Sequence, residues 1–161
     1  MSRARIGLSA IVSCLAATAA ALTLATAPAA AEVSGSADGT AGLDPLLAGA
    51  YTLAEREAHA AGVQMWIVSG YRTPAEQDAL WQQGLVQYGP DARRWVLPPD
   101  ESTHVSGRAV DVGPQSGAQW LEVNGNRWGL CRTFLNEWWH FELVTVPGTP
   151  CPPMLPDASH R

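Results

Sequence analysis

Apolar residues recur at helical spacing in the first strongly patterned part of the chain, residues 45–61. Leu47, Tyr51 and Ala54 would share one side of such a helix. An Asp-Pro pair comes directly before the helical core of the pattern and a glycine follows it, as is typical of helix ends. The sequence therefore predicts a helix with one apolar face available for a core.

A second helix is predicted over residues 73–83. Thr-Pro-Ala-Glu at its start combines a capping residue, a proline in the first turn and the glutamate of a capping box. We expect this helix to end at Gly84. Residues 85–101 contain Gly-Pro, Pro-Pro and several charges, so they are expected to form a long loop, and such loops in small domains are usually functional.

Three short runs rich in β-branched and aromatic residues predict strands at residues 63–68, 108–112 and 138–146. Side chains alternate between the two faces of a strand, so Ala109 and Asp111 should share one face. A short helix is expected between the second and third strands.

That short helix is expected at residues 116–123, and residues 147–161, with five prolines, should form a tail that covers the domain. Helices and strands are mixed without a regular β-α repeat, which predicts the α+β class. The chain of 161 residues has room for one small domain.

The first 31 residues have the composition of an export signal. Two arginines precede an apolar, alanine-rich stretch, and Ala-Ala-Ala at residues 29–31 offers a cleavage site. The stretch is long enough for a membrane anchor, although its Ala and Thr content makes it a weak span. Ile-Val-Ser-Cys, ending at Cys14, also resembles a lipoprotein cleavage box, although apolar residues continue well past it. We therefore expect an exported protein, secreted or cell-wall associated, with lipid attachment at Cys14 as the alternative.

Residues 32–42 are rich in glycine and serine and predict a flexible lead-in to a domain at residues 43–161. Without residues 1–31 the chain has eight arginines and fifteen acidic residues, a formal charge of −7 that argues against nucleic-acid binding. The whole sequence contains no lysine, which excludes Ser-x-x-Lys peptidases and Schiff-base chemistry. We expect a monomer with no stable membrane span after cleavage.

Cys131 and Cys151 remain after removal of the leader. A pair of thiols in an exported protein usually forms a disulfide. The alternative, thiolate metal ligands, has little support because the cysteines are twenty residues apart and no Cys-x-x-Cys accompanies them. The predicted disulfide would close a loop that contains Glu137 and His140.

The strongest candidate for chemistry combines two segments, residues 102–111 and residues 137–142. His104 and Asp111 in the first segment are a weak signal alone, because a satisfied polar pair in a loop has the same spacing. The second segment adds His140. Two imidazoles and one carboxylate leave a coordination position open for water, as in catalytic zinc sites. We therefore predict a site for one Zn²⁺.

Glu137 lies three residues before His140 and could act as a general base for the water. In a fully extended strand this odd separation would place the two side chains on opposite faces. Glu137 is therefore expected in a turn or bulge ahead of the strand. Trp139 and Phe141 should pack on the face opposite His140, and core packing is also the expected role of Trp138.

Three ordered motifs resemble a known family. They are Ser-Gly-Tyr-Arg-Thr at residues 69–73 with Gln77, then Ser-x-His-x-x-Gly-x-Ala-x-Asp, then Glu-x-Trp-His. Together, over residues 69–142, they resemble the zinc D-alanyl-D-alanine carboxypeptidases and dipeptidases of the VanY/VanX type. Residues 126–131 are also similar to the carboxypeptidase branch, whereas Trp138 stands where proline often precedes Trp-His. The resemblance implies a small α+β domain with a central antiparallel sheet and flanking helices, shared with the metal-binding domain of Hedgehog proteins.

The resemblance also implies roles for individual residues. His104, Asp111 and His140 would bind zinc, and Glu137 would be the base. Arg72 would polarise the scissile carbonyl and stabilise the oxyanion, a role in which a fixed cation in a dry site is effective.

The resemblance implies less strongly that substrate is bound by Tyr71, Gln77 and Ser102. Ser102 could equally be a turn residue. His59 and His160 fall outside the motifs and are expected to be exposed bystanders.

The expected function is therefore a zinc-dependent D-alanyl-D-alanine carboxypeptidase acting on peptidoglycan stem peptides. Three alternatives remain: a D-Ala-D-Ala dipeptidase, a lysin-type cell-wall endopeptidase and a non-catalytic peptidoglycan-binding module. The intact Glu137 argues against the last of these. The polar composition of residues 85–101 favours an open rim over a sealed lid, and so favours the carboxypeptidase.

Overall fold

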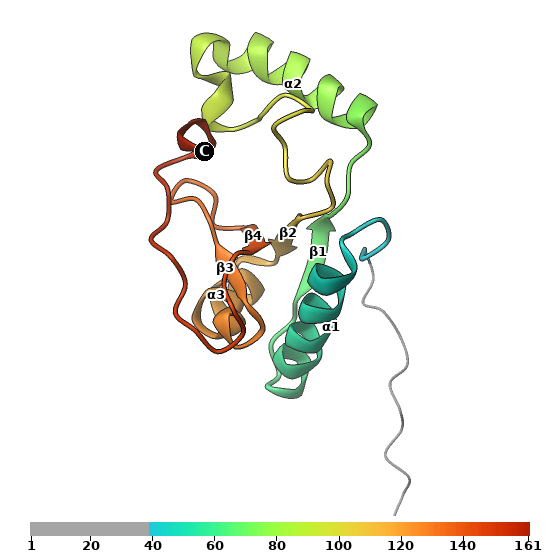
Figure 1. Cartoon of the computed structure of the whole chain (residues 1–161), viewed down its shortest axis with the longest axis vertical. Helices are drawn as coiled ribbons and strands as arrows, with labels where there is room; N and C mark the ends of the chain where they lie inside the picture. Colours follow the sequence, from blue (N-terminus) through green and yellow to red (C-terminus); the bar gives the residue numbers. More distant parts are fainter. Residues whose placement is uncertain (1–38) are drawn as a thin grey trace, which may run out of the picture. The chain divides into compact units, whose positions relative to one another are not determined.

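Four short antiparallel strands form the centre of the protein, whose computed structural model describes residues 39–161 (Figure 1). The strand order in the sheet is β1-β2-β4-β3. The strands are β1 Trp66–Ser69, β2 Ala109–Gly113, β3 Leu130–Arg132 and β4 His140–Leu143. The α-helices are α1 Pro45–Ala60, α2 Pro74–Tyr88 and α3 Gln115–Asn124, and 3-10 helices span Gly89–Arg94, Gly125–Trp128 and Ala158–His160. The predicted α+β class with a central antiparallel sheet is confirmed, while the predicted leader lies outside the described residues.

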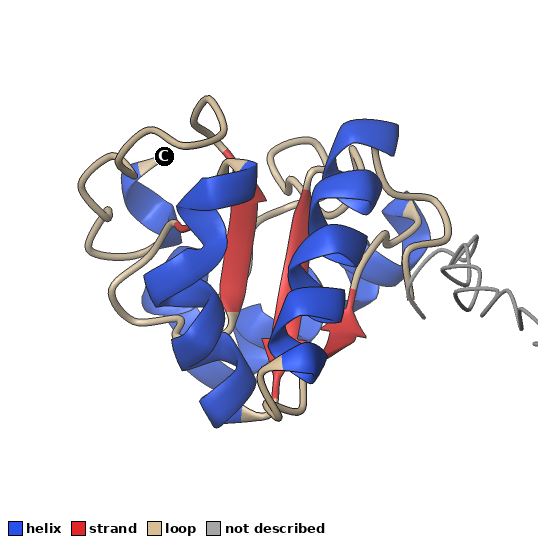
Figure 2. Cartoon of the chain, turned by 90° about the horizontal axis from the view of Figure 1, so that it is seen from below, coloured by secondary structure: helices blue, strands red, loops and turns tan. Residues whose placement is uncertain are grey.

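The core lies between the sheet and the two helices α1 and α3. The apolar face of α1 buries Leu47 and Tyr51 against it, as the helical spacing predicts. From β2, Val110 and Val112 enter this core, which leaves Asp111 between them pointing to the other face. Figure 2 shows the strands flanked by helices. The hydrophobic packing of one face of the sheet therefore decides which side chains the other face presents.

Both long predicted helices begin where expected. Asp44 caps α1 by accepting hydrogen bonds from backbone amides, and Thr73 and Glu76 form the predicted capping box of α2. The predicted end of α2 at Gly84 is wrong, because the helix continues to Tyr88. Gly84 is instead buried inside the helix next to Val96, and the helix ends where Gly89 adopts a φ of +55°.

The expected long loop at residues 85–101 is shorter than predicted. Its first part completes α2, and the 3-10 helix Gly89–Arg94 follows directly. Only residues 95–108 then connect to β2 without a regular element, and Figure 1 shows this connection between α2 and the strands. Glycine and proline in this segment mark the change from α-helix to 3-10 helix.

The first and last predicted strands are shorter than expected, whereas β2 has the predicted length and is shifted by one residue. β1 begins at Trp66, three residues later than expected, and β4 covers only four residues. β3 was not predicted, because three residues are too few to show an alternating pattern. The residues before β4 form a turn instead of strand, closed by a hydrogen bond from the His140 amide to the Glu137 carbonyl at 3.4 Å.

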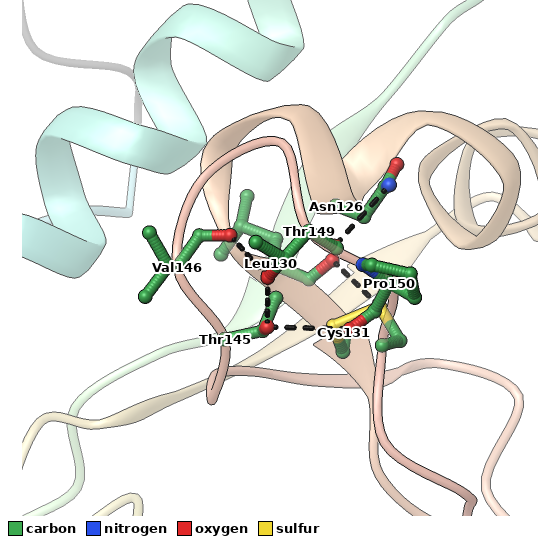
Figure 3. The surroundings of a disulfide bond; sticks show 8 residues. Asn126, Leu130, Cys131, Thr145, Val146, Thr149 and Pro150 are labelled. Atoms are coloured by element: carbon green, nitrogen blue, oxygen red, sulfur yellow. Dashed lines mark hydrogen bonds between the residues drawn. A yellow bond between two sulfur atoms is a disulfide. The ribbon is translucent and has the colours of Figure 1, made fainter.

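The predicted disulfide between Cys131 and Cys151 is confirmed, with Cα atoms 5.7 Å apart. Figure 3 shows the polar contacts around it, which include the Thr149 hydroxyl donating to the Val146 carbonyl at 2.7 Å. The disulfide ties the start of the proline-rich tail to β3. Farther along, Leu155 exchanges two backbone hydrogen bonds with residues 133 and 135, which attaches this part of the tail to the segment after β3.

The flexible lead-in predicted at residues 32–42 is wrong over its last four residues. Thr40 is buried, and the side chain of Tyr71 packs closely over Gly42. The packed domain therefore includes residue 39. Among the described residues, no helix is long and apolar enough to cross a membrane.

Reduction of the disulfide should lower the free energy of unfolding by about 3 kcal/mol, because a loop closed between cysteines twenty residues apart loses its restraint in the unfolded chain. Urea unfolding with and without dithiothreitol measures this difference. A variant with both Cys131→Ser and Cys151→Ser is the control, since dithiothreitol should not change its stability. Equal stability of the oxidised and reduced wild-type protein would contradict the prediction.

Candidate metal centre

Asp111 and His140 stand directly opposite each other on β2 and β4, so their side chains leave the same face of the sheet. His104 lies in the turn that precedes β2. His140 Nδ1 is 3.2 Å and His104 Nε2 is 3.4 Å from the same oxygen, Asp111 Oδ1. All three residues are buried, and their ligand atoms lie within 4.8 Å of one another. The structure thus brings together the predicted ligand set.

Neighbouring groups determine which nitrogen each imidazole presents. His104 Nδ1 hydrogen-bonds the carbonyl of Gly70 at 2.7 Å, which leaves Nε2 free to act as a ligand. His140 Nε2 is paired with Glu142 Oε1 at 2.7 Å, which leaves Nδ1 facing Asp111. Such outer contacts fix ring orientation and increase ligand basicity in histidine–metal sites.

The donor set fits zinc. With bonds of about 2.0 Å and tetrahedral angles, ligand atoms lie about 3.3 Å apart, close to the separations between Asp111 and the two histidines. Burial alone would lower the pKa of His140, but hydrogen bonds to Asp111 and Glu142 raise it to about 9. The carboxylates therefore create a field that favours positive charge at this point, as a bound cation requires.

Glu142 is itself held by two residues that sequence reasoning missed. Thr103 Oγ1 donates to Glu142 Oε1 at 3.2 Å, and Arg161 Nη2 donates to both carboxylate oxygens at 2.5 Å. Arg161 comes from the proline-rich tail, where no motif or periodicity marks it. Thr103 occupies an unspecified position inside one motif and Glu142 lies two residues after another, so only their proximity to the ligands could have identified them.

Arg72 is bound to the second oxygen of Asp111. Its Nη2 lies 2.7 Å from Asp111 Oδ2, its Nε donates to Ser69 Oγ at 2.9 Å, and its Nη1 donates to Gln77 Oε1 at 3.1 Å. Gln77 is buried and donates its amide to the Leu97 carbonyl at 2.8 Å. Gln77 therefore helps to orient Arg72 and also lines the cavity next to the ligands, while direct contact of Gln77 with a substrate stays a prediction.

A cavity of about 190 Å³ opens in front of the ligands. Ser102 and Arg72 line it, but Tyr71 does not and packs instead over Gly42. The expected core packing of Trp139 is wrong, because its half-buried side chain lines the cavity. Trp138 and Phe141 do pack in or against the core, as predicted.

The remaining wall of the cavity is largely apolar, although the composition of residues 85–101 favoured a polar rim. Trp95 and Leu97 of that segment face the cavity, and the buried ring of Phe134 lies beside them. The charges of the segment include Arg93 and Glu101, which pair with each other at the exposed edge. The cavity thus has one apolar side and one side that carries the metal ligands.

Glu137 reaches the same cavity from the turn that precedes β4, which confirms the expected turn. Its side chain is 8% exposed, and Oε2 lies 3.8 Å from His140 Nδ1. Burial raises the pKa of Glu137 to about 7, although the nearby positive groups His140 and Arg72 oppose this shift. By contrast, burial disfavours the charge on Asp111, but hydrogen bonds from His104 and His140 hold its pKa below the usual range. One carboxylate is thus fixed as an anion while the other can take up a proton.

Comparison with known proteins identifies the relatives of this site. The sequence model of the family "VanY: D-alanyl-D-alanine carboxypeptidase" matches residues 41–145, which include all three ligands and Glu137. The chain belongs to this family.

One curated relative of this VanY-family chain is a D-alanyl-D-alanine carboxypeptidase of Enterococcus faecalis (strain ATCC 700802 / V583), 28% identical. The match covers 55% of this chain and 43% of the relative, so the chain spans less than half of that protein's length.

Two solved structures with 25% identity and a TM-score of 0.59 are similar in fold. The first is a mutant of the vancomycin resistance D,D-pentapeptidase VanY with Zn(II), aligned over 64% of this chain and 73% of that one. The second is VanYB with D-alanine-D-alanine, aligned over 64% and 72%. An L,D-carboxypeptidase DacB of a streptococcus is also 25% identical, with a TM-score of 0.54 over 66% and 69%.

The two histidines outside the family motifs do not reach the site. His59 is exposed and its Nε2 is 3.0 Å from the Met65 carbonyl, while His160 is exposed and paired with Asp157. Both positions agree with the expectation that they are bystanders, and they provide matched controls for the metal ligands.

Purified protein should hold one zinc ion per chain, and His140→Ala should lose it because one of three protein ligands disappears. Metal analysis after dialysis measures the content. His160→Ala is the matched control and should retain the full amount of zinc. A His140→Ala variant that still binds one zinc as tightly as the wild type would refute the assignment of this ligand.

Proposed function

We propose that this protein is a zinc-dependent D-alanyl-D-alanine carboxypeptidase that removes the terminal D-alanine from peptidoglycan stem peptides. The observation that carries the proposal is the position of the buried Glu137 carboxylate beside the His-Asp-His set, in one cavity with Arg72. Family membership over residues 41–145 supports the same activity.

In the proposed reaction, His104, Asp111 and His140 would hold a zinc ion, which would supply the Lewis acidity that makes water a nucleophile near neutral pH. Glu137 accepts the proton of the attacking water and then delivers it to the leaving amine. A carboxylate whose pKa lies near 7 is well suited to both transfers, because it gains and loses a proton readily near neutrality. The contact of Glu137 with His140 at 3.8 Å supports this role, and in the proposal Glu137 is not a metal ligand.

Arg72 is the fixed positive charge that would stabilise the oxyanion formed at the scissile carbonyl. Asp111, Gln77 and the Ser69 hydroxyl hold its guanidinium at the edge of the cavity. Because these contacts exist before substrate arrives, little reorganisation would be needed during the reaction.

The cavity supports a small terminal residue as the group removed. Its volume of about 190 Å³ lies below the 300–1,000 Å³ that is roughly typical of sites for drug-sized ligands. The apolar wall of Leu97, Phe134 and Trp139 suits the methyl side chain of alanine. The rest of a stem peptide would extend from the cavity towards solvent.

We also infer that the protein works outside the cytoplasm. The disulfide between Cys131 and Cys151 suits an oxidising compartment, where peptidoglycan is also found. The leader pattern of the sequence favours the same location.

Glu137→Gln should lower kcat by about two orders of magnitude or more, the usual scale for loss of a general base, while the zinc content stays at one per chain. Steady-state release of D-alanine and metal analysis measure the two quantities. Glu57→Gln, at a half-exposed carboxylate paired with Arg127, is the matched control and should keep full activity. Loss of zinc from the Glu137 variant would instead make Glu137 a ligand.

The substrate should be a stem peptide ending in D-Ala-D-Ala, cleaved with higher kcat/KM than the free dipeptide, because the cavity holds the terminal residues and leaves the remaining chain outside. Three substrates are compared: a defined pentapeptide, the free dipeptide and a tetrapeptide ending in an L-diamino acid and D-alanine. Mass spectrometry of the products gives the order of their kcat/KM values. Preference for the free dipeptide would identify a dipeptidase. Preference for the tetrapeptide would identify an L,D-carboxypeptidase, and cleavage within the stem an endopeptidase.

A further inference from the structure

Arg132, the last residue of β3, turns its guanidinium into the segment that leads to Glu137. Its Nε donates to the carbonyls of Phe134 at 3.0 Å and of Glu137 at 3.2 Å. Its Nη2 donates to the carbonyl of Leu135 at 2.6 Å. One side chain, 16% exposed, thus collects three carbonyls from four consecutive residues.

The same guanidinium is anchored from its other end by α3. Arg132 Nη1 lies 3.0 Å from Glu122 Oε2, on a helix that packs against the sheet. The arginine therefore connects the segment before β4 to a rigid part of the fold, and its position does not depend on that segment alone.

Three carbonyl oxygens that point towards one place need a donor there, because partly buried carbonyls without partners are unfavourable and their dipoles repel one another. Arginine meets this need with several N–H groups in a planar fork, and a charged donor strengthens each hydrogen bond. Lysine carries the same charge but cannot reproduce the fork.

Other contacts hold the outer part of the segment. The side-chain amide of Asn136 donates to the Arg94 carbonyl at 2.9 Å. The backbone N–H of Leu135 donates to the Leu155 carbonyl at 2.9 Å. At Glu137 itself, the backbone bonds are the 3.2 Å contact with Arg132 and the long 3.4 Å bond that closes the turn with His140. Arg132 therefore has the larger part in setting where the Glu137 backbone lies.

We propose that Arg132 is a positioning residue that holds the Glu137 carboxylate at the distance from the metal ligands that turnover requires. The inference rests on the proposed function, because that function assigns proton transfer to Glu137. The ligands are held differently: His140 and Asp111 are fixed by strand pairing, and Glu142 orients His140. Loss of Arg132 should therefore reduce catalysis without releasing zinc.

The test compares Arg132→Lys with two controls. Arg127→Lys makes the same change at a half-exposed arginine that is paired with Glu57. Glu122→Gln removes the negative charge of the anchor on α3, keeps an oxygen that can accept from Arg132, and leaves the three carbonyl contacts possible. Arg132→Lys should lower kcat about 100-fold, as expected when a reacting group is misplaced by about 1 Å, with KM little changed and one zinc per chain. Arg127→Lys should behave as the wild type, and Glu122→Gln should lose far less activity than Arg132→Lys.

A double variant separates positioning of Glu137 from a general structural effect. In the Glu137→Gln background, Arg132→Lys should cause almost no further loss of kcat, because the group that it positions is already disabled. Fully additive losses, loss of zinc from Arg132→Lys, or an equal effect of Glu122→Gln would overturn the inference.

Amide hydrogen exchange supplies a measurement that does not depend on activity. Exchange in residues 134–139 should become faster in Arg132→Lys and remain unchanged in Arg127→Lys, while β2 stays protected. Unchanged exchange in Arg132→Lys would overturn the inference even if no substrate were turned over. Failure of the proposed function would instead show as a wild-type protein that binds zinc and cleaves none of the peptides.

Discussion

The pairing of β2 with β4 is the constraint on which the rest of the site depends. It sets Asp111 directly opposite His140, so that a carboxylate and an imidazole leave the sheet side by side. The register is specified because Val110, Val112 and Phe141 are buried in the core, and a slip by one residue would move these side chains to the wrong face. Hydrophobic packing on one face of the sheet thus determines ligand geometry on the other.

A chain of ionic contacts extends outwards from this pair. Asp111 uses one oxygen towards the histidines and the other towards Arg72, and Glu142 lies between His140 and Arg161. Each buried charge therefore has a partner of opposite sign, which offsets the desolvation that burial requires. Glu137 differs from the other acids, because its nearest cationic neighbour is 3.8 Å away and burial raises its pKa. This difference in surroundings explains how three carboxylates in one small volume can have different roles.

The sequence predicted those parts of the molecule whose signals are local. Helix caps at Asp44 and Thr73 follow from neighbouring residues, and the ligand set follows from two motifs of fixed spacing. The sequence did not reveal contacts between distant segments. Arg161 comes from an irregular tail, and β3 is too short for any periodicity. The continuation of α2 through Gly84 buries this glycine beside Val96, a contact that only the folded chain reveals. Trp139 was misassigned because alternation along a strand does not apply in the turn that the chain forms there.

The turn before β4 keeps Glu137 off the strand that carries His140, so the metal ligands and the acid rest on separate supports. This separation has an evolutionary consequence. In the proposed mechanism, a single substitution at Glu137 would abolish hydrolysis in a descendant while the metal site, the cavity and the fold persist. Such a descendant would still bind the proposed substrate without cleaving it. One mutation would thus be enough to turn an enzyme of this architecture into a binding protein.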